Sequence, residues 1–202
     1  MNVKLEELRS FYLKQHVPVM RPETARLLAS VTEDVRPKQV LEIGTCVGLG
    51  TILLLLSGAE KVTSIEIDEE RYLSAKENVR KFGLSDRFEP ILGDCREIVP
   101  LMENNRYDMI LLDGPKTYYR DFLPYIKKML LTGGVVFADD VLLHGWVEGE
   151  DLPERKHRTN VLALRQFIEE VKGDKEYECE EYPIEDGVLL FRRRKSTKNQ
   201  FA

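Results

Sequence analysis

The chain has 202 residues, of which 43% are hydrophobic, and its formal net charge at pH 7 is −5. This size and composition predict one domain with a sizeable core. The acidic balance excludes a globally basic nucleic-acid-binding protein, although it is compatible with a local basic surface. The longest aliphatic run, at residues 52–56, is far too short to span a bilayer, and the charged N-terminal segment is not a signal peptide. The three cysteines show no metal-ligand spacing, so we expect a protein of the reducing cytoplasm with no membrane partner.

The hydrophobic pattern predicts two N-terminal helices and then a regular alternation of strands and helices. The helices are expected at residues 3–15 and 22–32, where Pro22 suits a first helical turn. Gly133-Gly134 is expected to end a later helix before the fifth strand. Strands are expected at residues 38–43, 61–67, 87–92, 107–113, 135–139, 177–182 and 187–192. The intervening helices are expected at residues 48–57, 69–82, 96–103, 118–131 and 159–172.

This alternation predicts an α/β fold with a doubly wound, seven-stranded, mostly parallel sheet whose last strand is antiparallel. Within one domain, we expect a helical cap at residues 1–36, an α/β core at residues 37–194 and a flexible tail at residues 195–202. Ligands of such sheets bind at the carboxyl ends of the strands. The residues that follow each strand are therefore the candidate functional residues.

The segment VLEIGTCVGLGT joins the first strand to a helix through Gly44, Gly48 and Gly50. A glycine loop between a strand and a helix is the usual geometry for binding a nucleotide-like ligand. The spacing G-x-x-x-G-x-G differs from the G-x-G-x-x-G of dinucleotide-binding folds, which disfavours an NAD(P) oxidoreductase. Glu66 ends the second strand, where an acid can accept hydrogen bonds from both ribose hydroxyls, and Asp94 follows the third, where it can accept from an adenine amino group. Each acid alone is compatible with an ordinary solvated helix start, but together with the loop they indicate an adenosine-containing ligand.

Three carboxylates lie at the ends of the fourth and fifth expected strands. Asp113 ends the fourth strand, with Lys116 three residues later, and Asp139 and Asp140 lie at the end of the fifth. Carboxylates that converge at neighbouring strand ends repel one another unless a cation neutralises them. Ligands that are all oxygen favour Mg²⁺ or a similar hard divalent cation. The alternative is an ordinary set of helix-capping acids in polar loops.

The pattern E-x-G-x-x-x-G-x-G, at residues 42–50, resembles motif I of the class I S-adenosylmethionine-dependent methyltransferases. The resemblance covers nearly the whole chain and implies a Rossmann-like fold with S-adenosyl-L-methionine as the cofactor. In that family the glycine loop approaches the amino-acid part of the cofactor, and the acid lies near its ammonium group. The implied cofactor contacts are Met20, Glu42, Gly44, Thr45, Gly48, Gly50, Thr51, Glu66, Asp94 and Asp113.

The residues after the fourth and fifth strands resemble the metal site of the cation-dependent O-methyltransferases, the family of catechol and caffeoyl-coenzyme A O-methyltransferases. Asp113, Lys116 and Asp139 match that site residue by residue, whereas Asp140 replaces the usual Asn. The resemblance implies that Asp113, Asp139 and Asp140 hold Mg²⁺ and that Lys116, with its pKa lowered by the cation, accepts a proton from the substrate hydroxyl. The additional charge of Asp140 is expected to tighten metal binding and to weaken the Lewis acidity of the metal.

Within this family the sequence most resembles the bacterial tRNA 5-hydroxyuridine methyltransferases, which make 5-methoxyuridine at the wobble position. The shared features are the VPVM segment, the pattern D-[ND]-V-L followed by a glycine, and the basic stretch PERKHRTN. They imply a homodimer that binds a tRNA anticodon loop through Arg155, Lys156 and Arg158, with further phosphate contacts from residues 192–195. The basic stretch is equally compatible with a solvated helix start.

Two other functions stay open. One is a small-molecule catechol or phenylpropanoid O-methyltransferase whose acceptor lies under the loop VLLHGWVEGEDLP, and the other is a non-catalytic adenosine-binding module, which has no need of a metal site. His16 and His144 lack a second ligand at helical spacing and are expected to be structural. Trp146 is expected either to border the substrate pocket or to serve as a packing anchor or dimer contact.

Overall fold

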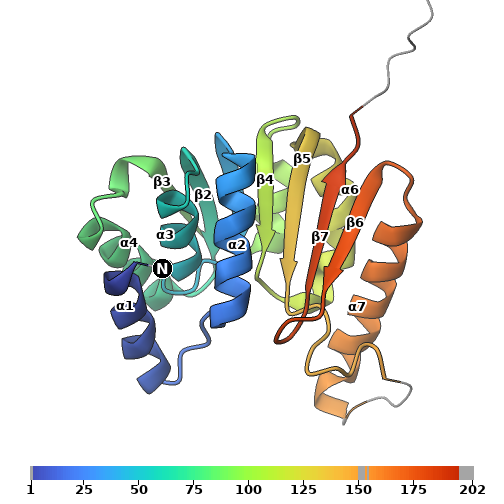
Figure 1. The fold of residues 1–202 in the computed structure, drawn as a ribbon, viewed down its shortest axis with the longest axis horizontal. Coiled ribbons are helices and arrows are strands. Elements are labelled where there is room, and N and C mark those ends of the chain that lie inside the picture. Colours follow the sequence, from blue (N-terminus) through green and yellow to red (C-terminus); the bar gives the residue numbers. More distant parts are fainter. Residues whose placement is uncertain (1, 150–152, 154, 196–202) are drawn as a thin grey trace, which may run out of the picture.

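The centre of the molecule is one seven-stranded sheet with the order β3-β2-β1-β4-β5-β7-β6 (Figure 1). The computed structural model describes residues 2–149, 153 and 155–195, so the tail expected at residues 195–202 lies outside the described residues apart from Lys195. β1 to β5 pair in parallel, and β7 is antiparallel to both β5 and β6. The expected sheet, with its antiparallel last strand, is confirmed. The strands are β1 (Gln39–Ile43), β2 (Lys61–Glu66), β3 (Phe88–Leu92), β4 (Tyr107–Leu112), β5 (Leu130–Asp139), β6 (Tyr177–Tyr182) and β7 (Val188–Arg193).

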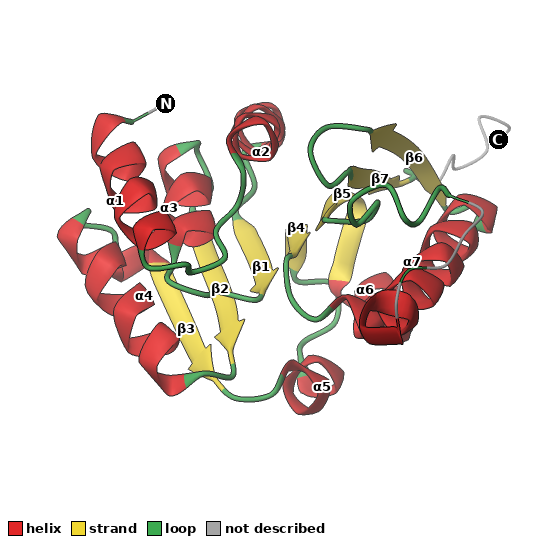
Figure 2. Ribbon diagram, turned by 90° about the horizontal axis from the view of Figure 1, so that it is seen from below, coloured by secondary structure: helices red, strands yellow, loops and turns green. Residues whose placement is uncertain are grey.

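Helices cover both faces of the sheet, as Figure 2 shows from below. They are α1 (Val3–Lys14), α2 (Pro22–Val35), α3 (Leu49–Leu56), α4 (Glu69–Lys81), α5 (Cys95–Ile98), α6 (Tyr119–Met129) and α7 (Arg155–Gly173). Side chains alternate between the two faces of each strand. Val40 of β1 therefore packs with α1 to α4, whereas Leu41 and Ile43 pack with α6 and α7. No helix among the described residues is both long enough and apolar enough to cross a membrane.

The structure corrects the role that the sequence predicted for Gly133-Gly134. α6 already ends at Met129, and both glycines lie inside β5. Leu130 pairs with Tyr107, and the next paired residue of β5 is Val135, so the residues between them form a bulge against β4. Gly133 has a φ of +82°, a conformation that glycine adopts without steric cost. A glycine pair suits a helix end or a bulge equally well, and here it forms a bulge.

The turn between β6 and β7, near the C-terminal end of the described chain, contacts the start of α2. The carboxylate of Glu185 caps α2 by accepting hydrogen bonds from the backbone N–H groups of Glu23 and Thr24, at 3.1 and 2.9 Å. The next residue, Asp186, forms an ion pair with Arg21 at 2.5 Å. A carboxylate at a helix N-terminus stabilises the unpaired N–H groups there. These contacts hold the start of α2 against the carboxyl end of β5, where the candidate site lies.

Candidate active site

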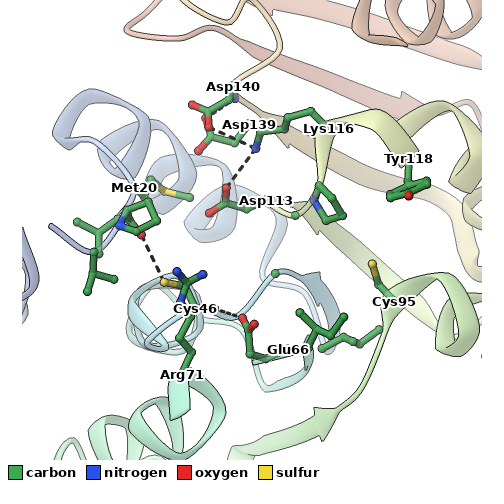
Figure 3. Close-up of a pocket in the computed structure, with 18 of the residues that line it drawn as sticks. Met20, Cys46, Glu66, Arg71, Cys95, Asp113, Lys116, Tyr118, Asp139 and Asp140 are labelled. Carbon is green, nitrogen blue, oxygen red and sulfur yellow. Dashed lines mark hydrogen bonds and ion pairs between the residues drawn. The ribbon is translucent and has the colours of Figure 1, made fainter. Parts of the chain in front are cut away.

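A cavity of about 840 Å³ opens at the carboxyl ends of β1 to β5 (Figure 3). This volume lies toward the upper end of the range for small-molecule sites, roughly 300–1,000 Å³. Its wall includes the residues that directly follow the five parallel strands and the segment between α1 and α2. The cavity therefore occupies the place that the strand-end rule predicts. Of the expected cofactor contacts, the wall includes Met20, Gly44, Glu66, Asp94 and Asp113.

Gly44 lies where the backbones that follow β1 and β4 approach each other. Its φ is +101°, and its N–H donates to the carbonyl of Ile65 at 3.1 Å. A Cβ atom at this position would lie 2.7 Å from the carbonyl carbon of Asp113 and 2.9 Å from the Cα atom of Gly114. Both neighbours are backbone atoms and cannot rotate away. Only glycine fits at the first position of the loop.

We expect Gly44→Ala to lower the free energy of unfolding by about 1–3 kcal/mol or more, because it adds a backbone clash to an unfavourable φ. The matched control is Gly58→Ala, since Gly58 has a similar φ of +110° and no atom within 4 Å of the added Cβ. Urea unfolding of the two variants separates the clash from the cost of the φ angle. Equal destabilisation by the two substitutions would contradict the close approach at Gly44.

The structure corrects the role that was expected for Glu42. Its side chain is only 1% exposed and does not line the cavity. One carboxylate oxygen accepts hydrogen bonds from the hydroxyls of Thr51 and Ser64. Burial raises the pKa of Glu42 to about 8, against the lowering effect of these hydrogen bonds. In this structure Glu42 therefore lies beneath the glycine loop, with its hydroxyl partners Thr51 and Ser64, and not on the cavity wall.

The other expected loop contacts lie behind the wall as well. The hydroxyl of Thr45 is hydrogen-bonded to that of Ser64 at 2.5 Å, and both side chains are buried. Gly48 faces α4, because a Cβ atom there would meet Ala75 at 3.1 Å. A Cβ atom on Gly50 would meet the carboxylate of Glu42. These residues shape the loop, and its backbone at Gly44 and Cys46 faces the cavity.

Glu66 and Asp94 both lie on the cavity wall as expected, but different groups of the protein bind the two carboxylates. Glu66 accepts hydrogen bonds from the N–H groups of Cys46 and Asp68, at 2.7 and 3.0 Å, and its carboxylate keeps lone pairs for a ligand. Asp94 caps α5 by accepting from the N–H of Arg96 at 2.8 Å, and it also forms an ion pair with the Arg96 guanidinium. A ligand that donates to Asp94 therefore competes with Arg96 for this carboxylate.

Among the wall residues that were not anticipated are Arg71 and Cys46. Arg71, on the first turn of α4, extends toward Cys46 and Glu66 in Figure 3. The thiol of Cys46 donates to the carbonyl of Pro18 at 3.4 Å, which connects the glycine loop to the segment between α1 and α2. Burial raises the pKa of Cys46 to about 11, so this thiol is a weak nucleophile. A charged residue in a first helical turn is common, and the sequence carries no signal for Arg71.

At the other end of the cavity the three predicted carboxylates converge. One oxygen from each of Asp113, Asp139 and Asp140 lies within 4.8 Å of the others, and Figure 3 shows the three side chains around the Lys116 ammonium. The Nζ atom of Lys116 lies 3.4 Å from Asp113 Oδ1 and 3.3 Å from Asp140 Oδ2. It also donates to the Tyr119 hydroxyl at 2.9 Å. The fourth and fifth strand ends thus form one charged cluster.

The charges of this cluster are unbalanced. Burial and the neighbouring Asp140 raise the pKa of Asp113 to about 6, with Lys116 acting in the opposite direction. Burial, with Asp113 and Asp140 nearby, also raises the pKa of Asp139 well above its usual range. A hard divalent cation fits this all-oxygen set of three carboxylates, which a single ammonium does not neutralise.

Lys116 is more basic in this structure than the sequence analysis expected. Burial acts to lower the pKa of its ammonium, but Tyr119 and the three carboxylates outweigh it and raise the pKa well above its usual range. The lowered pKa inferred from the family resemblance applies to a site that holds a cation. Without the cation, Lys116 keeps its proton and acts as the counter-ion of the cluster.

The basic residues expected to contact tRNA divide into two groups. Arg155 and Arg158 are exposed on the first turn of α7, which Lys156 shares. The other group lies far from the carboxylates, because Arg192 pairs with Val135, four residues before Asp139 on β5. The side chains of that group bind within the fold: Arg192 donates to the carbonyl of Gly133, Arg193 to that of Leu130, and Arg194 to Glu178. Arg192 and Arg194 are exposed, and the phosphate contacts expected from residues 192–195 stay a prediction.

Known proteins resemble the chain along most of its length. A caffeoyl-CoA O-methyltransferase of Stellaria longipes is 25% identical over 85% of this chain and 75% of that protein, and one of Populus kitakamiensis is 27% identical over 94% and 86%. The solved O-methyltransferase of Bacillus cereus in complex with SAH has a TM-score of 0.83 at 20% identity, covering 96% of this chain and 92% of that chain. TomG of Streptomyces achromogenes, involved in tomaymycin synthesis and solved in complex with SAM, has a TM-score of 0.85 at 21% identity, covering 96% and 91%. Because the model of the O-methyltransferase family matches residues 1–194, the chain belongs to the O-methyltransferase family.

Proposed function

We propose that this O-methyltransferase moves the methyl group of S-adenosylmethionine to one of two adjacent oxygens of an acceptor, with Mg²⁺ or a similar cation at the carboxylate cluster. The observation that carries the proposal is that Asp113, Asp139, Asp140 and Lys116 line the same cavity as the glycine loop and Glu66. Two neighbours of the same fold, from Bacillus cereus and Streptomyces achromogenes, are complexes with SAH and SAM. They support this choice of cofactor.

In this proposal one group of residues binds the cofactor and another group binds and activates the acceptor. Glu66 accepts from the ribose hydroxyls, and the backbone of the glycine loop lies against the amino-acid part of the cofactor. Asp113, Asp139 and Asp140 would hold the cation, whose charge favours the deprotonated form of an acceptor hydroxyl. With the cation in place, Lys116 would be the neutral amine that takes the proton of that hydroxyl at Nζ, oriented by the Tyr119 hydroxyl at 2.9 Å. The acceptor oxygen then forms its bond to the methyl carbon while the carbon–sulfur bond breaks and its electron pair stays on sulfur.

For the acceptor we propose 5-hydroxyuridine at the wobble position of tRNA. Its O4 and O5 atoms are adjacent and can share one cation as the two oxygens of a catechol do. Arg155 and Arg158 are exposed at the start of α7. His157, between them, contacts Trp146 of the loop that follows Asp140, with 4.9 Å between ring centroids. This contact connects the basic helix start to the loop beside the carboxylates and supports an acceptor that carries phosphates.

A small catechol-type acceptor is the second candidate. Its support is the name of two relatives, the caffeoyl-CoA O-methyltransferases of Stellaria longipes and Populus kitakamiensis, together with the ring of Tyr118, which lines the cavity two residues after Lys116 (Figure 3). An acceptor of this kind fits inside the cavity without reaching the basic start of α7. Salt separates the two candidates, because binding through phosphates weakens steeply as salt rises and catechol binding does not.

The test is a methyl-transfer assay with labelled S-adenosylmethionine and Mg²⁺, given tRNA that carries 5-hydroxyuridine or, separately, a simple catechol. We expect label in the tRNA, loss of that label in excess EDTA, and a steep decline with salt. Label in the catechol alone would show that the acceptor is a small molecule, and it would leave the proposed role of the metal site unchanged. Full activity in EDTA would contradict the proposed role of the carboxylates.

A further inference from the structure

The loop between β5 and α7 contains an unusual backbone conformation. Three consecutive residues, Leu143, His144 and Gly145, have φ values of +45°, +59° and +76°. Side chains of L-residues rarely adopt this region, and a leucine there is unfavourable. Such a turn persists only where the surrounding structure holds it, and it is found most often at functional sites.

Two residues from distant parts of the sequence, Asp186 and Arg165, hold this turn. The carbonyl of Asp186 accepts from the N–H of Leu143 at 3.2 Å, and its carboxylate accepts from the N–H of His144 at 3.1 Å. Arg165 of α7 donates to the carbonyls of Trp146 and Val147, at 3.0 and 2.9 Å. The fold thus fixes the backbone on both sides of the turn, and the side chains on it are held in place before any ligand arrives.

Three neighbouring rings form what we call the aromatic platform: His144 and Trp146 on this loop and His157 on α7. The His144 and Trp146 centroids are 5.1 Å apart in an edge-to-face arrangement, and the His157 ring lies 4.9 Å from Trp146 at an interplanar angle of 41°. The His144 side chain is 53% exposed, and the other two rings are half-buried. The rings are anchored on one side and reach solvent on the other.

The platform borders the carboxylate end of the cavity. The Nδ1 atom of His144 lies 2.9 Å from the carboxylate of Asp186, and Asp186 lines the cavity together with Asp139 and Asp140. On its outer side, Arg155 and Arg158 are exposed on the same helical turn as His157. Exposed rings flanked by cations are the surface on which unpaired nucleobases stack while the cations contact the phosphates.

We propose that the aromatic platform stacks an unpaired nucleobase of single-stranded RNA, next to the nucleotide whose oxygen reaches the carboxylate end of the cavity. Arg155 and Arg158 contact the phosphates on either side of that base. The inference rests on the proposed RNA acceptor and assigns it a second point of attachment outside the cavity. In this proposal the strained turn fixes the rings before RNA binds, so that stacking a base costs less conformational entropy.

Trp146 is the only tryptophan of the chain, so its fluorescence reports directly on the platform. The experiment titrates the full-length protein with a short RNA stem-loop and with a fully paired RNA duplex of the same length, without Mg²⁺ or S-adenosylmethionine. We expect the stem-loop to quench Trp146 and the duplex to quench it much less. His157→Ala is expected to weaken stem-loop binding at least about fivefold, the effect of one lost stacking contact, and to leave duplex binding unchanged.

The matched control is Phe11→Ala, because Phe11 is a 54% exposed aromatic side chain on α1. It should bind both RNAs like the wild type. His144→Asn keeps a residue that tolerates a positive φ, so it tests the second ring without releasing the turn. Melting temperatures of all variants exclude unfolding as the cause of weaker binding.

The outcomes separate the platform from the proposed acceptor. Equal quenching by stem-loop and duplex, or unchanged stem-loop binding by His157→Ala, overturns the platform even if tRNA is methylated. Label in the catechol alone, with no stem-loop binding, overturns both the platform and the RNA acceptor. Selective stem-loop binding that His157→Ala weakens supports the platform.

Discussion

Replacing Asp139 by asparagine is expected to lower the rate of methyl transfer at least about a hundredfold, because one of the three charges that hold the cation is removed. The folded structure should not suffer. Asp139 is 4% exposed and accepts from the N–H of Asp140 at 2.7 Å, a bond that the asparagine oxygen can keep. Burial already disfavours the ionised form of this side chain and holds its pKa well above the usual range. In EDTA we therefore expect Asp139→Asn to melt at or above the temperature of the wild type.

The effect of Mg²⁺ on the melting temperature distinguishes the loss of the cation site from a general loss of stability. A cation that binds only the folded protein raises its melting temperature, and the rise grows with concentration. We expect this rise for the wild type and for the matched control Asp86→Asn, since Asp86 is an exposed acid away from the cavity. It should be absent or much reduced for Asp139→Asn. A full Mg²⁺ response by that variant would contradict the assignment of Asp139 as a ligand.

The carboxylate cluster could be predicted because its position depends only on the order of the strands in the chain and on the edge of the sheet at which parallel strands end. Parallel strands that lie side by side end at the same edge, and β4 pairs with β5. Asp113 follows β4 directly, and Asp139 is the last residue of β5. No side-chain conformation enters this reasoning. The same reasoning placed Glu66 and Asp94 on the wall of the cavity, where the structure has them.

Residues whose role depends on side-chain direction could not be placed in this way. Arg192 was grouped with the basic stretch by composition, but the antiparallel pairing of β7 places it beside Val135, far from the cavity. Arg71 reaches the wall only because its long side chain leaves α4 in that direction. For Glu42 the sequence did contain an indication of its buried position, which is the alternation of side chains along β1. Glu42 lies between Leu41 and Ile43 on one strand, and alternation points it toward the face that α3 covers.

The buried position of Glu42 leads to the second large effect, a contribution of this side chain to the pH dependence of stability that Glu42→Gln should remove. The pKa of Glu42 is raised from 4.5 to about 8 by burial. Below pH 4.5 the side chain is protonated in both the folded and the unfolded states, so it adds no pH dependence. Between pH 4.5 and about 8 only the unfolded state releases the proton, and the free energy of unfolding falls as pH rises. The total loss is roughly 4–5 kcal/mol, and it is complete above the folded-state pKa.

Glutamine is neutral at every pH and can accept the same hydrogen bonds from Thr51 and Ser64 through its oxygen. Glu42→Gln should therefore match the wild type near pH 4.5 and exceed it by a few kcal/mol at pH 8, measured by urea unfolding across this range. The control Glu60→Gln changes an exposed glutamate and should show no such trend. The same variant also tests the position of Glu42 beneath the loop. If the side chain only supports the loop, S-adenosylhomocysteine should bind Glu42→Gln about as well as it binds the wild type. A loss of tenfold or more with stability intact would place the carboxylate in direct contact with the ammonium of the cofactor, because a charge-assisted hydrogen bond contributes about 1.5–3 kcal/mol.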